Sequence, residues 1–238
     1  MQGDDLLDEA RRDGGGVGVG GATRVVDQHV EAAEAVDGVS HEGGRVVGVA
    51  DVLVRNAVDR FGRLDVLVNN AGGSPDADAA TVSPRFVEKI VALNLLAPAY
   101  MAQAANLVMR EQETGGAIVN IGSVSAHQPQ PGTAAYTAAK AGLLGLTKAL
   151  ALEWAPKVRV NHITTGLIRT EAAASVYGED GGAAVTRTLP MERMAVPSDI
   201  AKACLFLGSD LSSYVNGADL AVHGGGEYPA RYMATQGN

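Results

Sequence analysis

The chain has 238 residues, of which 46% are hydrophobic and 19% charged, and its 19 basic and 27 acidic side chains give a formal net charge of −8. This composition is typical of a globular protein that needs no disulfide or metal to fold. An acidic chain without a basic block argues against binding to nucleic acid or to an anionic membrane. The single cysteine, Cys204, excludes an internal disulfide and a cysteine-cluster metal site. No secretory signal is visible, so we expect a cytoplasmic protein.

The first 48 residues differ in composition from the rest. They are rich in Gly, Val, Ala and Asp, and no Ile, Lys, Pro, Cys or aromatic residue precedes Phe61. The glycine-rich run 14–20 follows a mostly charged stretch that does not have the pattern of a strand. Residues 1–48 are therefore interpreted as an atypical segment, and Asp51 and Val52 as part of a helix that ends before Asp65.

From about residue 52 onward, short apolar runs alternate with longer helical stretches. The apolar runs predict buried strands at 65–69, 116–121, 158–164 and 218–222. Ser83 and Pro84 are a typical N-cap and first residue of a helix, and further helices are predicted at 133–154 and 199–207. This alternation predicts an α/β fold, a doubly wound parallel sheet covered by helices on both faces, within a single domain spanning 1–238.

Residues 90–109 carry no charge over a length that could span a membrane. The stretch contains four polar or helix-breaking residues, however, and six of its residues are alanine. Each polar group would need a partner in hydrocarbon. We therefore predict a helix buried in a soluble protein.

Tyr136 and Lys140 form the sharpest chemical signal in the chain. Residues four apart lie on one face of a helix, about 6 Å apart along its axis. An ammonium group beneath a phenol favours the phenolate, which can exchange a proton with a substrate hydroxyl near neutral pH.

The surrounding motifs carry a family resemblance. Ser123 lies 13 residues before Tyr136 at the end of a predicted strand; Asn69-Asn70-Ala71-Gly72 ends the preceding strand. Asn94 lies in the intervening helix. Further on, Val-Arg-Val-Asn at 158–161 begins a predicted strand that is followed by Gly-Leu-Ile-Arg-Thr at 166–170. Together, over residues 52–226, these motifs resemble the short-chain dehydrogenase/reductase family, especially 3-oxoacyl reductases and hydroxysteroid dehydrogenases. The resemblance implies a Rossmann-like fold and an enzyme that transfers a hydride between NAD or NADP and a secondary alcohol or ketone.

The resemblance also assigns roles to individual residues. Tyr136 matches the catalytic acid/base, Lys140 the residue that binds the nicotinamide ribose, and Ser123 the hydroxyl that orients the substrate oxygen. The remaining matches are Asn94 for a proton-relay water, Asn70, Ala71 and Gly72 for the turn beside the cofactor's adenosine, and Ile168 and Thr170 for contacts with the nicotinamide carboxamide.

Simpler roles are open for several of these residues. Ser123 could cap a turn, with Ser125 as the alternative serine. Asn94 could satisfy local backbone groups, and Thr170 could be the N-cap of a following helix. The five histidines share no metal-ligand spacing, so no metal site is predicted.

The chain departs from the family at its N-terminus, where a strand and a Thr-Gly-x-x-x-Gly-x-Gly turn are expected to meet the cofactor pyrophosphate. Here that strand and turn are atypical or missing, and no residue distinguishes NAD from NADP. One account is a divergent N-terminus, which would make the chain a non-catalytic binding or assembly partner. The other is a start or reading-frame fault. Thr165-Gly166 also replaces the family's usual Pro-Gly, for which we expect a modest effect.

Residues 171–196 match the family's substrate loop. Its apolar candidates are Tyr177, Leu189, Met191 and Met194, and its glycines are Gly178, Gly181 and Gly182. These suit a lipid-like substrate, such as an acyl thioester or steroid fragment, and equally a lid that packs on its own domain. The resemblance further implies a homo-oligomer, a tetramer or dimer. Small residues along the predicted 133–154 helix would let another helix approach, unless they pack on the chain's own sheet: Ala134, Ala138, Ala141, Gly145 and Ala149.

Overall fold

The computed structural model describes residues 25–27, 43–170 and 182–235. The glycine-rich run 14–20 and residues 171–181 of the predicted substrate loop, with Tyr177, Gly178 and Gly181, lie outside the described residues.

Five parallel strands form one sheet in the order β1-β2-β3-β4-β5 within the described residues. Four of them match the predicted strands to within one residue at each end: β2 (Val66–Asn69), β3 (Gly116–Ile121), β4 (Val158–Thr165) and β5 (Asp219–Val222). The sequence did not predict β1 (Val25–Asp27), which pairs with β2 in a register that places Val25 opposite Val66. We expected the family's first strand and glycine-rich turn to be atypical or missing; β1 is a strand of three residues beside β2, and in the chain it follows the glycine-rich run 14–20 instead of preceding it.

The helices alternate with the strands along the chain. In order they are α3 (Gly43–Phe61), α4 (Pro84–Val91), α5 (Ala97–Met109), α6 (Ala134–Trp154), α7 (Ala183–Thr186), α8 (Pro197–Gly208) and α9 (Ala230–Thr235). A π-helical turn, η1 (Ala92–Leu96), joins α4 to α5, and two 3-10 turns are η2 (Val124–Ala126) and η3 (Asp210–Ser212). As predicted, Ser83 caps α4, because its hydroxyl accepts a hydrogen bond from the backbone N–H of Phe86.

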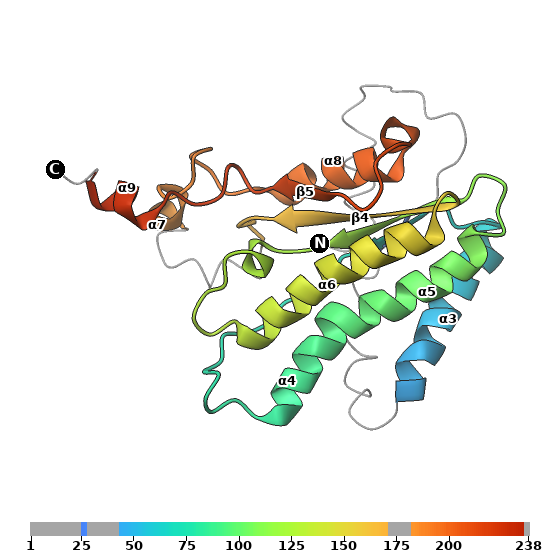
Figure 1. The fold of residues 1–238 in the computed structure, drawn as a ribbon, viewed down its shortest axis with the longest axis horizontal. Helices are drawn as coiled ribbons and strands as arrows, with labels where there is room; N and C mark the ends of the chain where they lie inside the picture. The colour runs from blue at the N-terminus through green and yellow to red at the C-terminus, as the bar shows by residue number, and fades with distance from the viewer. Residues whose placement is uncertain (1–24, 28–42, 171–181, 236–238) are drawn as a thin grey trace.

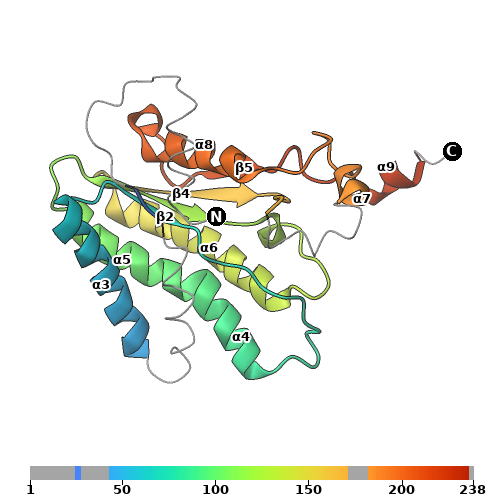
Figure 2. The same ribbon diagram turned by 180° about the vertical axis from the view of Figure 1, so that it is seen from behind.

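The two faces of the sheet carry two apolar clusters. Helices α3, α4, α5 and α6 lie on one side and α8 on the other (Figures 1 and 2). Leu67 and Ile118 point into the cluster with α3 and α5, whereas their neighbours Val66 and Val119 point into the cluster with α8. This alternation follows from the two-residue period of a strand. Both faces are therefore apolar and covered by helix, which confirms the predicted Rossmann-like α/β class.

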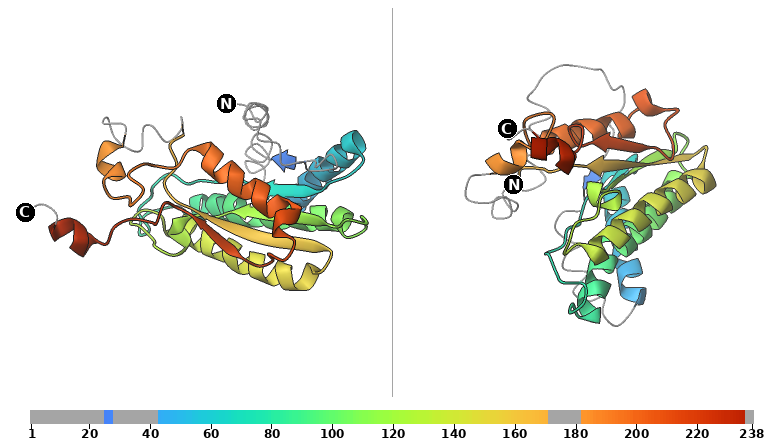
Figure 3. Two further views of the ribbon diagram at one scale, coloured as in Figure 1. Left: turned by 90° about the horizontal axis from the view of Figure 1, so that it is seen from above. Right: turned by 60° about the vertical axis from the view of Figure 1, so that its left-hand side comes forward.

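The long apolar helical stretch Pro84–Met109 is, by length and composition alone, able to cross a membrane. In the structure 56% of its apolar window is buried inside the protein. Met101, Ala102, Ala105 and Met109 pack in the cluster beneath the sheet. The stretch therefore has the packing of a core helix, as predicted. Seen from above, α8 crosses the sheet, whereas α9 extends beyond the sheet's end (Figure 3).

Candidate active site

The residues predicted to act on substrate and cofactor follow the carboxyl ends of three adjacent strands. Asn70 follows β2, Ser123 follows β3, and Gly166 follows β4. Because these strands are parallel neighbours, their carboxyl ends meet at one edge of the sheet. Ligands of open α/β folds bind at this edge. The sheet thus brings motifs from residues 70, 123 and 166 to one side of the molecule.

Lys140 lies on the sheet-facing side of α6 and is almost fully buried, with 3% of the residue exposed. Its ammonium donates a hydrogen bond of 2.8 Å to the backbone oxygen of Ile121, the last residue of β3. Burial disfavours the charged form and lowers the pKa of Lys140 from 10.5 to about 8. The group therefore stays protonated at neutral pH while holding its proton less tightly than an exposed lysine does.

Tyr136 lies one turn earlier on α6 and is half-buried. The Lys140 Nζ is 5.7 Å from the centroid of the Tyr136 ring, within the range of a cation–π contact. The predicted i, i+4 pair is thus formed as a contact between a phenol and an ammonium group. This arrangement favours negative charge on the phenol oxygen.

Asn94 is fully buried in the π-helical turn η1. Its side chain accepts from the N–H of Gly73 and donates to the carbonyl oxygens of Gly73 and Ile90, each at 2.9 Å. The amide therefore satisfies local backbone groups, as the simpler interpretation holds, and its relay role stays a prediction. Wide π-type turns are frequent at functional sites, and the sequence did not predict this one.

Gly72 is the point where Asn94 and Lys140 meet. A Cβ built on Gly72 would lie 2.8 Å from Asn94 Oδ1 and 3.1 Å from Lys140 Nζ. Any side chain at this position would displace both groups. The predicted Asn70-Ala71-Gly72 turn is therefore in direct contact with the predicted catalytic residues, and the absence of a side chain is what allows the close approach.

Ser123 has extended backbone geometry and is 8% exposed. Its Oγ accepts a hydrogen bond of 3.1 Å from the N–H of Ser125 and so caps η2. The capping contact uses the oxygen as an acceptor and leaves the hydroxyl hydrogen for a substrate oxygen. The two roles considered for Ser123 are thus compatible in one side chain.

The segment after β4 is joined to the segment before α8. Ile168 forms a parallel bridge with Ala195, and the N–H of Arg169 donates to the Ala195 oxygen at 2.9 Å. Thr170 is the last residue described before position 171 of the predicted loop. The cofactor roles of Ile168 and Thr170 stay predictions.

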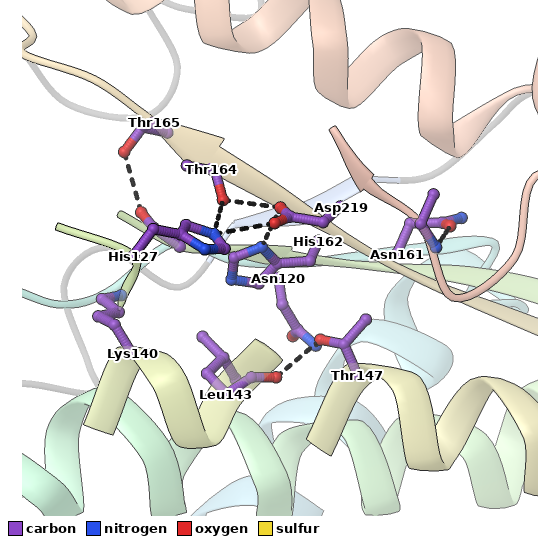
Figure 4. A network of polar contacts seen from close by, with 12 residues as sticks. Asn120, His127, Lys140, Leu143, Thr147, Asn161, His162, Thr164, Thr165 and Asp219 are labelled. Carbon is purple, nitrogen blue, oxygen red and sulfur yellow. Dashed lines mark hydrogen bonds and ion pairs between the residues drawn. The ribbon is translucent and has the colours of Figure 1, made fainter. Parts of the chain in front are cut away.

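A second cluster at the same edge was missed by sequence reasoning, and we call it the acid network: His127, His162, Thr164 and Asp219 (Figure 4). The Asp219 carboxylate accepts from Thr164 Oγ1 at 2.7 Å and lies 2.8 Å from His162 Nδ1 and 3.0 Å from His127 Nε2. His162 is fully buried, and burial lowers its pKa below the usual 6.5 even though Asp219 opposes the shift. The signal in the sequence was a set of polar residues inside apolar strands, which only the β4–β5 register brings together.

A further set of buried polar residues, the amide network, is Asn69, Asn120 and Thr147. Asn120 accepts from Asn69 Nδ2 at 2.8 Å and donates to Thr147 Oγ1 at 2.9 Å. Thr147 in turn donates to the Leu143 oxygen of its own helix. These contacts tie β2, β3 and α6 together immediately behind the candidate site. Among the described residues no group of three or more His, Cys, Asp or Glu is arranged to hold a metal ion.

Comparisons with known proteins show the family of the chain. A family described as enoyl-(acyl carrier protein) reductase matches residues 25–227. The chain belongs to the short-chain dehydrogenase/reductase family. It is 38% identical over 218 residues to D-threitol dehydrogenase of Mycolicibacterium smegmatis, covering 87% of this chain and 83% of that protein. Over 211 residues it is 36% identical to 3alpha-hydroxysteroid dehydrogenase of Mediterraneibacter gnavus, covering 86% and 84%.

A solved structure shares the fold as well as the sequence. The crystal structure of a blue fluorescent protein from a metagenomic library, in complex with NADPH, superposes with a TM-score of 0.68 at 32% identity over 75% of this chain and 71% of that one. Family membership confirms the predicted class of enzyme, a short-chain dehydrogenase/reductase acting on CH–OH groups. The match from residue 25 also includes β1, the strand that the sequence alone did not predict.

Proposed function

We propose that the chain transfers a hydride between NAD or NADP and a secondary alcohol or ketone. The observation that carries this proposal is the contact of half-buried Tyr136 with the buried ammonium of Lys140, beside Ser123 at the end of β3. The residues present fit a nicotinamide cofactor in one further respect. Gly72 leaves an approach between Asn94 and Lys140 that a single Cβ would close.

Each side chain has a distinct task in this reaction. NAD or NADP, when bound, supplies or accepts the hydride. Tyr136 holds and moves the proton at its phenol oxygen, favoured as phenolate by the neighbouring ammonium. Lys140 uses one N–H for the Ile121 carbonyl and has two others for the ribose hydroxyls. Ser123 orients the substrate oxygen by donating its hydroxyl hydrogen.

The test is Tyr136→Phe, which removes only the phenol oxygen. We expect turnover of a secondary alcohol to fall by at least 100-fold (about 3 kcal/mol of transition-state stabilisation) with the fold unchanged by circular dichroism. Tyr214→Phe is the matched control, because Tyr214 is fully exposed on the turn between η3 and β5, outside the predicted site. A Tyr136→Phe variant that keeps more than a tenth of the wild-type rate would refute the assignment.

Cofactor binding separates this function from the alternative of a non-catalytic relative. Calorimetric titration of the folded protein with NADH and NADPH should show saturable binding of at least one of them. Failure to bind either at millimolar concentration, in a sample with a cooperative unfolding transition, would favour an assembly or binding role instead. The same titration decides which nucleotide is preferred.

A lipid-like substrate is the finer proposal. Its support is Met191, which is 58% exposed in the segment before α8. Leu189 and Met194 are 5% and 3% exposed and pack within the domain, as the lid interpretation expects. Among the apolar candidates that the structure describes, Met191 is therefore the one that supports a lipid-like substrate. Turnover of a steroid alcohol and of a short polyol, compared at equal concentration, tests it. A preference for the polyol by more than tenfold in kcat/KM would overturn the lipid-like class.

Assembly into a homo-oligomer, most simply a tetramer, is supported by the outer face of α6. Its five small residues, from Ala134 to Ala149, are all exposed rather than packed on the chain's own sheet. Leu152 on the same helix and Leu107 on α5 are 84% and 52% exposed. Sedimentation equilibrium should give a multiple of the chain mass at micromolar concentration, whereas a monomer mass for folded protein would refute the proposal.

A further inference from the structure

Gly122 lies between the two groups that the reaction needs from β3. Its preceding carbonyl, that of Ile121, is the acceptor for the Lys140 ammonium, and the next residue is Ser123. A shift of this one residue would move the acceptor and the serine hydroxyl together. How Gly122 is held therefore decides how well the site is formed.

Two backbone atoms of Gly122 are tied to β4. Its N–H donates to the Ile163 oxygen at 2.8 Å, and its carbonyl oxygen accepts from Thr165 Oγ1 at 2.9 Å. These bonds fix the residue in the plane of the sheet. They do not stop the peptide from moving out of that plane toward α6.

His162 blocks that direction. A Cβ built on Gly122 would lie 2.0 Å from Cε1 and 2.1 Å from Nε2 of His162, so the imidazole edge occupies the space of a side chain at position 122. The ring itself is fixed from behind, because His162 Nδ1 lies 2.8 Å from Asp219 Oδ1. Asp219 is held in turn by Thr164 and His127 (Figure 4).

We propose that His162 is a positioning residue of the active site: its ring, oriented by Asp219, presses against Gly122 and fixes the peptides that carry Ser123 and the acceptor of Lys140. This inference rests on the proposed function. It assigns to a buried histidine on β4 a share in keeping both reacting side chains in place. It also accounts for the carboxylate of Asp219 beside the apolar sheet, since the ring needs an acceptor for its Nδ1–H.

The position of the ring also controls the surroundings of Lys140. The pKa of Lys140 is lowered to about 8 because the ammonium is buried. If the ring were shortened, water could enter beside Gly122 and the charged form would be better solvated. The titration of Lys140 therefore reports the contact even in protein that carries no cofactor.

The experiment compares His162→Asn with Asn161→Ala in the full chain. Asn at 162 keeps a donor for Asp219 but ends short of Gly122. Asn161 is the matched control, because it is the adjacent residue, is 1% exposed, and bonds Val215 and Ala218 on the other side of the strand. Lys140 is titrated by NMR on isotope-labelled lysine, with Lys140→Met assigning the signal, and kcat and KM are measured separately.

We expect His162→Asn to raise the pKa of Lys140 by about one unit toward its ordinary value and to lower kcat about tenfold or more, because misplaced reacting groups lose rate steeply. The KM for cofactor should change less than threefold. Asn161→Ala should leave the Lys140 pKa unchanged. Equal changes in both variants, or none in His162→Asn, would overturn the proposal.

Two further variants keep the test decisive. Asp219→Asn retains an acceptor for the ring and removes only the charge, so the Lys140 pKa should stay near wild type; a shift as large as that of His162→Asn would overturn the proposal, because charge rather than contact would then be responsible. If His162→Asn does not fold, His162→Gln is used instead, because it places an amide at the Nε2 position against Gly122. The Lys140 pKa and kcat of this variant should stay near their wild-type values, and a clear change in either would contradict the proposal. If the wild-type protein oxidises no alcohol, the proposed function fails, but the Lys140 titration still decides this inference.

Discussion

The two polar networks on the α6 side of the sheet differ in kind although they lie on adjacent strands: all members of the amide network are buried, whereas His127 and Asp219 of the acid network are exposed. The amide network of Asn69, Asn120 and Thr147 contains only neutral groups, and it joins β2 and β3 to α6. The acid network centres on one carboxylate, Asp219, which meets two imidazoles and a hydroxyl from β4 and the loop after β3. Asn120 and His162 face each other across β3 and β4, so the two networks meet at a single cross-strand pair.

Their difference shows what each type of network can contribute to a site. A neutral network fixes strands to a helix at every pH, because none of its members titrates near neutrality. A network with a carboxylate and histidines fixes an element only while its protonation state is right. The neutral amide network lies behind Lys140, and the titratable acid network lies beside Gly122.

The largest effect is expected where the acid network touches β3. Gly122→Ala would place a methyl group within 2.1 Å of the His162 ring and should destabilise the fold by about 3 kcal/mol or more. Gly145→Ala is the control, since nothing lies within 4 Å of a Cβ there and alanine favours the helix. Urea denaturation of both variants measures the difference. Recovery of stability in the Gly122→Ala, His162→Ala double variant would assign the cost to the ring, and no recovery would contradict that assignment.

The amide network should give a smaller loss that does not depend on pH. Asn120→Ala leaves the Asn69 amide and the Thr147 hydroxyl with one partner fewer each in a buried place, at a cost of about 2 kcal/mol. Because no member titrates, the loss should be the same at pH 5 and pH 8 in urea denaturation. A loss that varied by more than about half of its value across that range would mean that Asn120 supports the neighbouring histidine as well.

The acid network should make stability depend on pH. Burial holds the pKa of His162 below 6.5, so below that pH the unfolded chain binds a proton that the folded chain does not. Stability should therefore fall as the pH drops from 6.5 toward the folded pKa and be independent of this group above it. The loss should be smaller than that of Asn120→Ala, because Asp219 opposes part of the shift.

Comparing wild type with His162→Asn isolates this contribution from that of the other histidines. The difference in unfolding free energy between the two proteins should change between pH 5 and 6.5 and be flat from 6.5 to about 7, above which the expected rise of the Lys140 pKa adds a change of its own. The pKa of Asp219 is also held low, so its own contribution is lost only below about pH 3.8, outside that window. A flat difference throughout would mean that His162 binds its proton equally in both states.

Most of the fold follows from local patterns. β3 matches its predicted bounds, and α6 begins one residue later than predicted, because apolar runs and helical spacing are properties of neighbouring residues. β1 escaped prediction because three residues in a stretch rich in Gly and Ala carry too little pattern. The π-helical turn at Asn94 escaped because a one-residue widening leaves the apolar spacing of the helix nearly unchanged.

The candidate site divides in the same way. Tyr136 and Lys140 are four residues apart, so helix geometry alone brings them together. His162 and Asp219 are separated by 57 residues and meet only through the β4–β5 register. The hydrophobic pattern of either strand alone does not show how the two strands are aligned. From the sequence we expected only a modest effect of Thr165 in place of the family's usual proline, and the pattern gave no sign that its hydroxyl donates a hydrogen bond to the Gly122 carbonyl.

Removing the Thr165 hydroxyl should give the smallest of the predicted losses of stability. Thr165→Val keeps the β-branched shape of a residue that is 7% exposed and removes one hydrogen bond, so a loss of about 1 kcal/mol is expected in urea denaturation. Thr164→Val is the control on the same strand. It removes the hydroxyl that donates to Asp219 and leaves the hydrogen bond to Gly122 in place. Because the ring of His162 still presses on Gly122 in the Thr165 variant, the Lys140 pKa should stay near 8. A rise of that pKa as large as the one expected for His162→Asn would mean that the in-plane bond, rather than the ring, keeps water from the ammonium group.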